Sequence, residues 1–86
     1  MKTIATKSFL KPLFRIERGT YPWNDSQYTK YITTDCEYIY FPVAHLVTCL
    51  SNRRNIRNST WAYTKKEPED RVFKDIREHY DNNYGK

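Results

Sequence analysis

Residues 41–66 read FPVAHLVTCLSNRRNIRNSTWAYTKK, and the two halves of this stretch differ in character. The first half begins with Pro42, which suits the first turn of a helix because its missing N–H would have no partner there. Apolar residues then recur at the i, i+3, i+4 and i+7 spacing of one helical face, at Val43, Leu46, Val47 and Leu50. This spacing predicts a short buried helix over residues 42–50.

The second half of the stretch is basic and rich in amides. No acidic residue lies between Ser51 and Lys66, while five side chains there are cationic. Arginine and asparagine donate hydrogen bonds to phosphates and base edges, and aromatic rings stack on unpaired bases. We therefore predict a nucleic-acid-binding surface, with RNA or single strands favoured over duplex DNA. Its residues are Arg53, Arg54, Asn55, Arg57, Asn58, Trp61, Tyr63, Lys65 and Lys66, together with Trp23 and Lys30.

The charge of the whole chain agrees with an anionic partner. The net charge is +5 and the pI is about 9.3. Residues 1–34 carry six Lys or Arg against two acids, whereas residues 67–86 carry four against six. A local surplus of positive charge favours nucleic acid or another anionic partner.

Outside residues 41–66 the pattern predicts strands and one further helix. Residues 2–10 and 13–18 resemble two short strands of a hairpin, and residues 28–41 give the strongest strand signal. A second helix follows Pro68, with one apolar stripe at Val72, Phe73, Ile76 and Tyr80. The predicted order is β-β-loop-β-α-(β)-α in a single domain over residues 1–86. This is an α+β fold, a small antiparallel sheet of three or four strands with two helices packed on one face.

The core is predicted from the two helical stripes and the strand alternation. Its expected residues are Phe14, Ile16, Ile39, Val43, Leu46, Val47, Leu50, Val72, Phe73 and Ile76. Between the strands, residues 19–27 form a predicted loop because Gly, Pro, Asn, Asp and Ser surround Trp23. Trp23 is expected either at a binding surface or folded back as a lid over the core.

Two cysteines and two histidines are the candidate metal ligands. His45 and Cys49 are four residues apart on the predicted helix, and Cys36 and His79 would complete a set of four. The paired C-x2-C spacing of strong zinc motifs is missing, and small buried cysteines are common in cores. We therefore predict free thiols, no metal and no other cofactor.

Catalytic motifs are missing as well. The chain has only two glycines, so it offers no glycine-rich phosphate loop, and it has no nucleophile elbow or spaced carboxylate cluster. The sequence therefore predicts a binding protein and not an enzyme.

A protein partner is the alternative to nucleic acid. Tyr, Trp and Arg dominate the hot spots of protein interfaces, and the chain has eight tyrosines. Under this hypothesis the chain is a protein–protein interaction module or an inhibitor of a host factor, of the type found among small phage or mobile-element accessory proteins. The same residues serve both hypotheses, so the target is either nucleic acid or another macromolecule of the host.

No membrane partner is expected. No apolar run approaches the ~20 residues that cross a bilayer. Near the N-terminus, Pro12, Arg15 and Glu17 interrupt any apolar core of a signal peptide. We therefore expect a cytoplasmic, intracellular protein.

Overall fold

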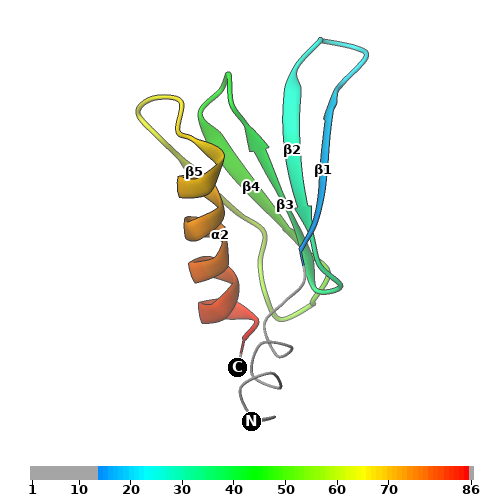
Figure 1. Cartoon of the computed structure of the whole chain (residues 1–86). Helices are drawn as coiled ribbons and strands as arrows, with labels where there is room; N and C mark the ends of the chain where they lie inside the picture. The colour runs from blue at the N-terminus through cyan, green and yellow to red at the C-terminus, as the bar shows by residue number, and fades with distance from the viewer. Residues whose placement is uncertain (1–13, 86) are drawn as a thin grey trace, which may run out of the picture.

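The structure is a computed structural model that describes residues 14–85. Five strands form one antiparallel sheet in the order β1-β2-β3-β4-β5, so each strand pairs with its neighbour in the sequence. The elements are β1 (Arg15–Thr20), β2 (Gln27–Ile32), β3 (Cys36–Phe41), β4 (Leu46–Ser51), β5 (Ser59–Ala62) and the helix α2 (Glu69–Asn83) (Figure 1). The helix predicted after Pro68 is confirmed as α2. The strand predicted over residues 2–10 lies outside the described residues.

The number of strands and helices corrects the predicted fold. The sheet has five strands instead of three or four, and residues 14–85 contain one helix instead of two. The predicted helix over residues 42–50 is wrong: a turn at 42–45 and strand β4 occupy this stretch. Pro42 lies in the turn, and His45 leaves it with a φ of 59°.

Burial in β4 follows the two-residue period of a strand. Val47 and Cys49 are completely buried, whereas Leu50 is 41% exposed. Leu46 and Leu50 are four residues apart, and this spacing satisfies a helical face and a strand face equally well. Two features favour the strand: the whole of β4 pairs with β3, and Val47 and Thr48 are β-branched.

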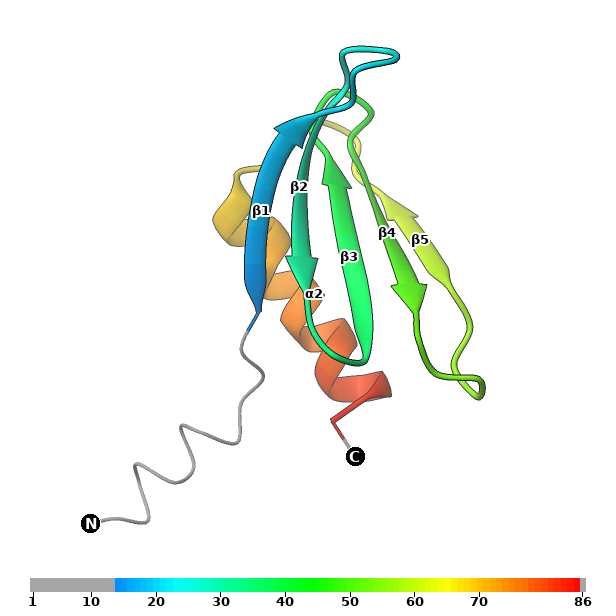
Figure 2. The same cartoon turned by 90° about the vertical axis from the view of Figure 1, so that its right-hand side faces the viewer.

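The main core lies between the sheet and α2. The sheet contributes mainly tyrosines, since Tyr31, Tyr38 and Tyr40 are each no more than 2% exposed. The helix contributes Val72, Ile76 and Tyr80. Figure 2 shows α2 behind one face of the sheet, and no helix of residues 14–85 covers the other face, which we call the open face.

Several predicted core residues lie elsewhere. Val47, Ile39, Val72 and Ile76 are buried, and Phe14 and Phe73 are half-buried against the core. Val43, in the β3–β4 turn, is 79% exposed, and Ile16, on the edge strand β1, is 45% exposed. Val43 and Ile16 are therefore not part of the core, although both are apolar. No helix within residues 14–85 has the length and apolar character needed to span a membrane.

Candidate interaction site

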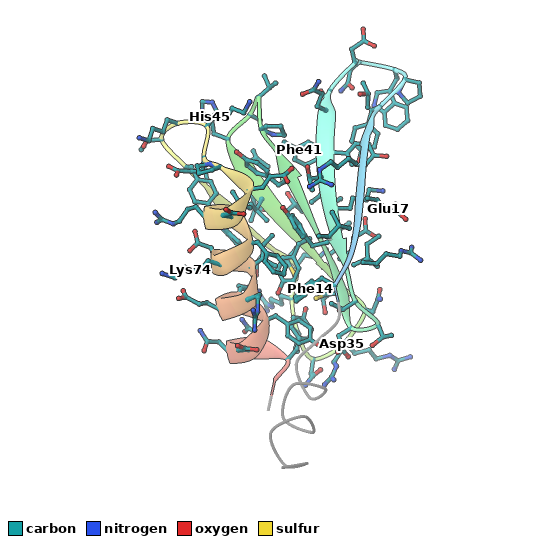
Figure 3. The ribbon with its side chains drawn as sticks, in the orientation of Figure 1. Phe14, Glu17, Asp35, Phe41, His45 and Lys74 are labelled. Carbon is teal, nitrogen blue, oxygen red and sulfur yellow. The ribbon has the colours of Figure 1, made fainter. Side chains whose placement is uncertain are left out.

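The residues predicted to bind nucleic acid lie at opposite ends of the sheet. Residues 52–58, the β4–β5 loop, lie at the end where α2 finishes, next to the turn that carries Asp35 (Figure 3). Trp23 and the pair Lys65 and Lys66 lie in loops at the other end, and Lys30 lies on the open face between the two ends. The fold therefore does not bring the whole predicted set into one surface.

Trp61 and Tyr63 make their contacts inside the fold. Both are half-buried against the main core. The indole N–H of Trp61 donates to the hydroxyl of Tyr63 at 2.9 Å, and that hydroxyl donates to Asp75 at 2.7 Å. The ring of Trp61 also lies 5.3 Å from the ring of His79 on α2. These contacts explain why both rings face the helix.

Arg53 is held by a carboxylate. Its guanidinium donates to Oδ1 of Asp35 from Nε at 3.0 Å and lies 2.9 Å from the same oxygen through Nη2. The hydroxyl of Tyr80 donates to the other oxygen of Asp35 at 2.5 Å. The hydrogen bond from Tyr80, followed by those from Arg53, holds the pKa of Asp35 below its usual value. Asp35 thus joins the end of α2 to the β4–β5 loop.

Hydrogen bonds also fix the backbone of the β4–β5 loop. The Ser51 amide donates to the side chain of Asn58 at 2.8 Å, and the Asn52 amide donates to the Asp35 carbonyl at 2.8 Å. Ile56 packs half-buried against the core. The loop therefore has a defined shape, and the side chains of Arg54, Asn55 and Arg57 remain exposed on it.

Three loops lie at the opposite end of the sheet, which we call the three-loop end: residues 21–26, 42–45 and 63–68 (Figure 1). Trp23 in the first loop is 74% exposed, and Val43 in the second is 79% exposed. Trp23 is therefore not a lid over the core. Loops carried by a rigid sheet are common places for binding residues.

The first of these loops is internally bonded. The amide of Tyr21 donates to the carbonyl of Ser26 at 2.9 Å, and the amide of Asp25 donates to the carbonyl of Tyr21 at 2.9 Å. Asp25 has a φ of 57°, a conformation that aspartate tolerates better than most residues. The backbone around Trp23 is therefore held in one arrangement despite its exposure.

An aromatic stack supports Trp23 from behind. Its ring lies 4.8 Å from the ring of Tyr21 at an interplanar angle of 25°. Tyr21 in turn lies 4.6 Å from Tyr28 and 6.2 Å from Phe41, both on the open face. Tyr28 lies across Gly19 on the neighbouring strand, where an added Cβ would come within 2.5 Å of the tyrosine hydroxyl. The missing side chain at Gly19 thus gives the stack its room.

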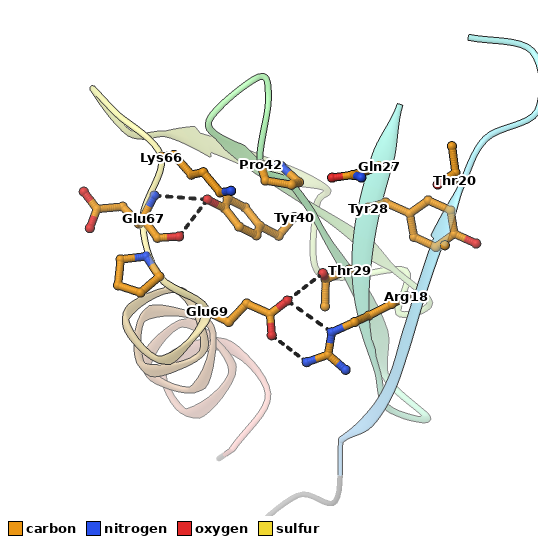
Figure 4. Close-up of a pocket in the computed structure, with 12 residues that line it drawn as sticks. Arg18, Thr20, Gln27, Tyr28, Thr29, Tyr40, Pro42, Lys66, Glu67 and Glu69 are labelled. Carbon is orange, nitrogen blue, oxygen red and sulfur yellow. Dashed lines mark hydrogen bonds and ion pairs between the residues drawn. The ribbon is translucent and has the colours of Figure 1, made fainter. Parts of the chain in front are cut away.

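A cleft of about 520 Å³ lies beside the three-loop end, between the β1–β2 hairpin and the start of α2 (Figure 4). Arg18 donates to Glu69 at 2.5 Å and 3.3 Å, and the hydroxyl of Thr29 donates to the same carboxylate at 3.0 Å. The hydrogen bond from Arg18 is the main reason that the pKa of Glu69 is lowered. On the opposite wall, the Tyr40 hydroxyl donates to the carbonyl of Glu67 and accepts from its amide.

The cysteines and histidines do not form a common site. Cys36 and Cys49 are buried free thiols on the helix side of the sheet. His45 lies at the three-loop end, whereas Nδ1 of His79 lies 2.8 Å from the hydroxyl of Tyr38. Within residues 14–85, no three potential metal ligands come together.

The sequence contains a signal for the aromatic stack, because Tyr21 and Trp23 are two large aromatic residues in a turn-rich loop. It does not reveal that Tyr28 and Phe41 join them, because that depends on the pairing of β1, β2 and β3. Comparison with known proteins finds no matching protein family, no matching curated protein and no matching solved structure. The function must therefore be inferred from the geometry of these two ends.

Proposed function

We propose that this protein is a protein-interaction module that docks its three-loop end on a partner protein. The observation that carries the proposal is Trp23, which is 74% exposed although its ring is stacked on Tyr21 and its loop is internally bonded. Tryptophan is the residue most enriched among interface hot spots. An anchor that is ordered before binding loses little conformational entropy when the complex forms.

The surroundings of Trp23 favour a protein over a nucleic acid. Val43, an aliphatic residue with nothing to offer a phosphate or a base edge, is the most exposed large apolar residue at the same end. Residues 14–85 hold eleven Lys or Arg and ten Asp or Glu, so most of the net charge of +5 comes from residues 1–13 and Lys86. An aromatic and aliphatic surface on a nearly neutral body fits the apolar centre of a protein interface.

The test is site-specific photo-crosslinking in cells of the source organism. Benzoylphenylalanine in place of Trp23 should crosslink to a protein, and the same residue in place of Arg54 serves as the matched control. Excess wild-type protein should abolish the crosslink at position 23, whereas excess Trp23→Ala should not. Equal crosslinking from both positions, or a crosslinked species at position 23 that nuclease removes, would contradict the proposal.

Nucleic-acid binding at the other end is the second candidate function. Arg54, Asn55 and Arg57 support it, because they are exposed on an ordered loop within a stretch that has no acid between Ser51 and Lys66. Such donors bind phosphates and base edges. We also propose a cytoplasmic location, supported by the two free thiols, since cysteines stay reduced in that compartment.

A further inference from the structure

The cleft beside the three-loop end is built from both sides by polar groups. Arg18, Gln27 and Thr29 line one side, and Tyr40, Lys66 and Glu69 line the other. Arg18 and Lys66 come from segments far apart in the sequence, and the pairing of β1 with β2 and the entry into α2 bring both to the same space (Figure 4).

The charge inside the cleft is positive by one unit. Arg18 and Lys66 are cations, and Glu69 is the carboxylate that faces Arg18. The side chain of Glu67 points away from the cleft, and only its backbone groups face Tyr40 (Figure 4). No acidic group of residues 14–85 lies within ion-pair distance of Lys66.

Both cations have hydrogen-bond donors to spare. A guanidinium has five N–H donors, and Arg18 uses Nε and one N–H of Nη2 on Glu69. Its side chain is 62% exposed, so the remaining donors are accessible. The ammonium of Lys66 has three donors. A single carboxylate between them would neutralise the surplus charge, whereas a dianionic phosphate would leave the cleft negative.

We infer that this cleft receives an acidic side chain, Asp or Glu, of the partner protein that docks on the three-loop end. The inference rests on the proposed function for the identity of the ligand. Trp23 then supplies the apolar anchor, and the carboxylate in the cleft fixes the orientation of the partner beside it. Charge pairs at the edge of an interface contribute mainly specificity of this kind.

The cleft can be tested without the partner. The probe is the peptide acetyl-Gly-Glu-Gly-amide, added in the millimolar range to ¹⁵N-labelled protein, with acetyl-Gly-Gln-Gly-amide as the neutral control. Saturable shifts are expected for the amides of Thr20, Gln27 and Lys66 with the glutamyl peptide only. Lys66→Ala should weaken binding about fivefold, the upper end for one exposed ion pair, while Lys65→Ala leaves it unchanged.

Three outcomes would overturn the inference: equal shifts with the glutaminyl peptide, equal shifts at Arg54 and Arg57, or tighter binding of inorganic phosphate at the same amides. This titration is independent of the photo-crosslink at position 23. A crosslink without peptide binding would leave the docking proposal standing and reject the cleft as its acidic subsite. Peptide binding without a crosslink would support the cleft as a carboxylate site and contradict docking.

Discussion

The hydroxyl of Tyr80 donates a hydrogen bond to the carboxylate of Asp35 at 2.5 Å, and this contact joins the last turns of α2 to the β2–β3 turn. Arg53 binds the other oxygen of the same carboxylate. The helix, the turn and the β4–β5 loop are thus held together at one end of the molecule by a single acidic group.

Tyr80→Phe should lower the free energy of unfolding by about 1.5 kcal/mol at pH 7, because a hydrogen bond to a charged acceptor is lost while the ring stays. The pKa of Asp35 is lowered in the folded state, so its contribution is present above its unfolded pKa, about 3.9, and is lost as the pH falls through the folded value. The difference between wild type and variant, measured by urea unfolding, should therefore shrink below pH 4. A difference that stays constant down to pH 2.5 would contradict this role.

The lowered pKa of His79 predicts a second pH dependence of stability, in a different pH range. Burial lowers its pKa, so the unfolded chain binds the proton first, near pH 6.5. Stability should therefore fall as the pH drops below about 6.5 and level off below the folded pKa, with a slope of at most about 1.4 kcal/mol per pH unit. His79→Gln keeps a polar group beside Tyr38 and should flatten the curve between pH 5 and 7. An unchanged slope would assign the effect to another group.

How much of this fold follows from the sequence is clearest in residues 42–50. Val43, Leu46, Val47 and Leu50 match a helical face, but a strand that follows a turn at Pro42 matches the same residues from 46 onward. The deciding interaction, pairing with β3, is long-range and leaves no trace in local spacing. In contrast, α2 is predicted correctly, because Pro68 and the acidic Glu69 and Asp70 mark the start of a helix and the apolar stripe follows at helical spacing.

The candidate site was predictable in part for the same reason. The exposed loop around Trp23 and the acid-free loop around Arg54 can be recognised from composition. The sequence does not reveal that these two loops lie at opposite ends of the sheet, since that depends on the direction of each strand. The ion pair between Arg53 and Asp35 could not be predicted either, because the two residues are 18 positions apart in the sequence.

Two aliphatic residues of the predicted core, Ile76 and Val43, should contribute very differently to stability. Ile76→Ala removes a side chain that is completely buried and should cost about 2–5 kcal/mol. Val43→Ala, at a position that is 79% exposed, should change stability by less than about 0.5 kcal/mol. Chemical denaturation of both variants checks this. Similar losses in the two would place Val43 in the core after all.

Gly19→Ala should disturb the aromatic stack without unfolding the sheet. The added methyl group would meet the hydroxyl end of Tyr28, which can swing away, so we expect a stability change below about 1 kcal/mol. Displacement of Tyr28 removes the support of Tyr21 and frees Trp23. In a Trp61→Phe background, the near-ultraviolet circular dichroism of Trp23 should weaken. An unchanged spectrum would show that the stack does not depend on Gly19.

The final prediction concerns the β4–β5 loop and its three arginines. If Arg54 and Arg57 hold phosphates, changing both to Ala should reduce the slope of log K against log salt by about 1.4 for a single-stranded RNA, since each contact releases counterions. Arg53→Ala is the matched control, because the guanidinium of Arg53 is bound to Asp35. Its loss should lower the stability of the protein and change the salt slope little. Fluorescence anisotropy of a labelled RNA over a salt series measures the slopes, after circular dichroism confirms folding. Equal losses of slope in Arg53→Ala and in the double variant would show that the loop acts as diffuse charge. Wild-type binding no tighter than about 10⁻⁴ M at physiological salt, the weak limit of nonspecific binding, would reject the second candidate function.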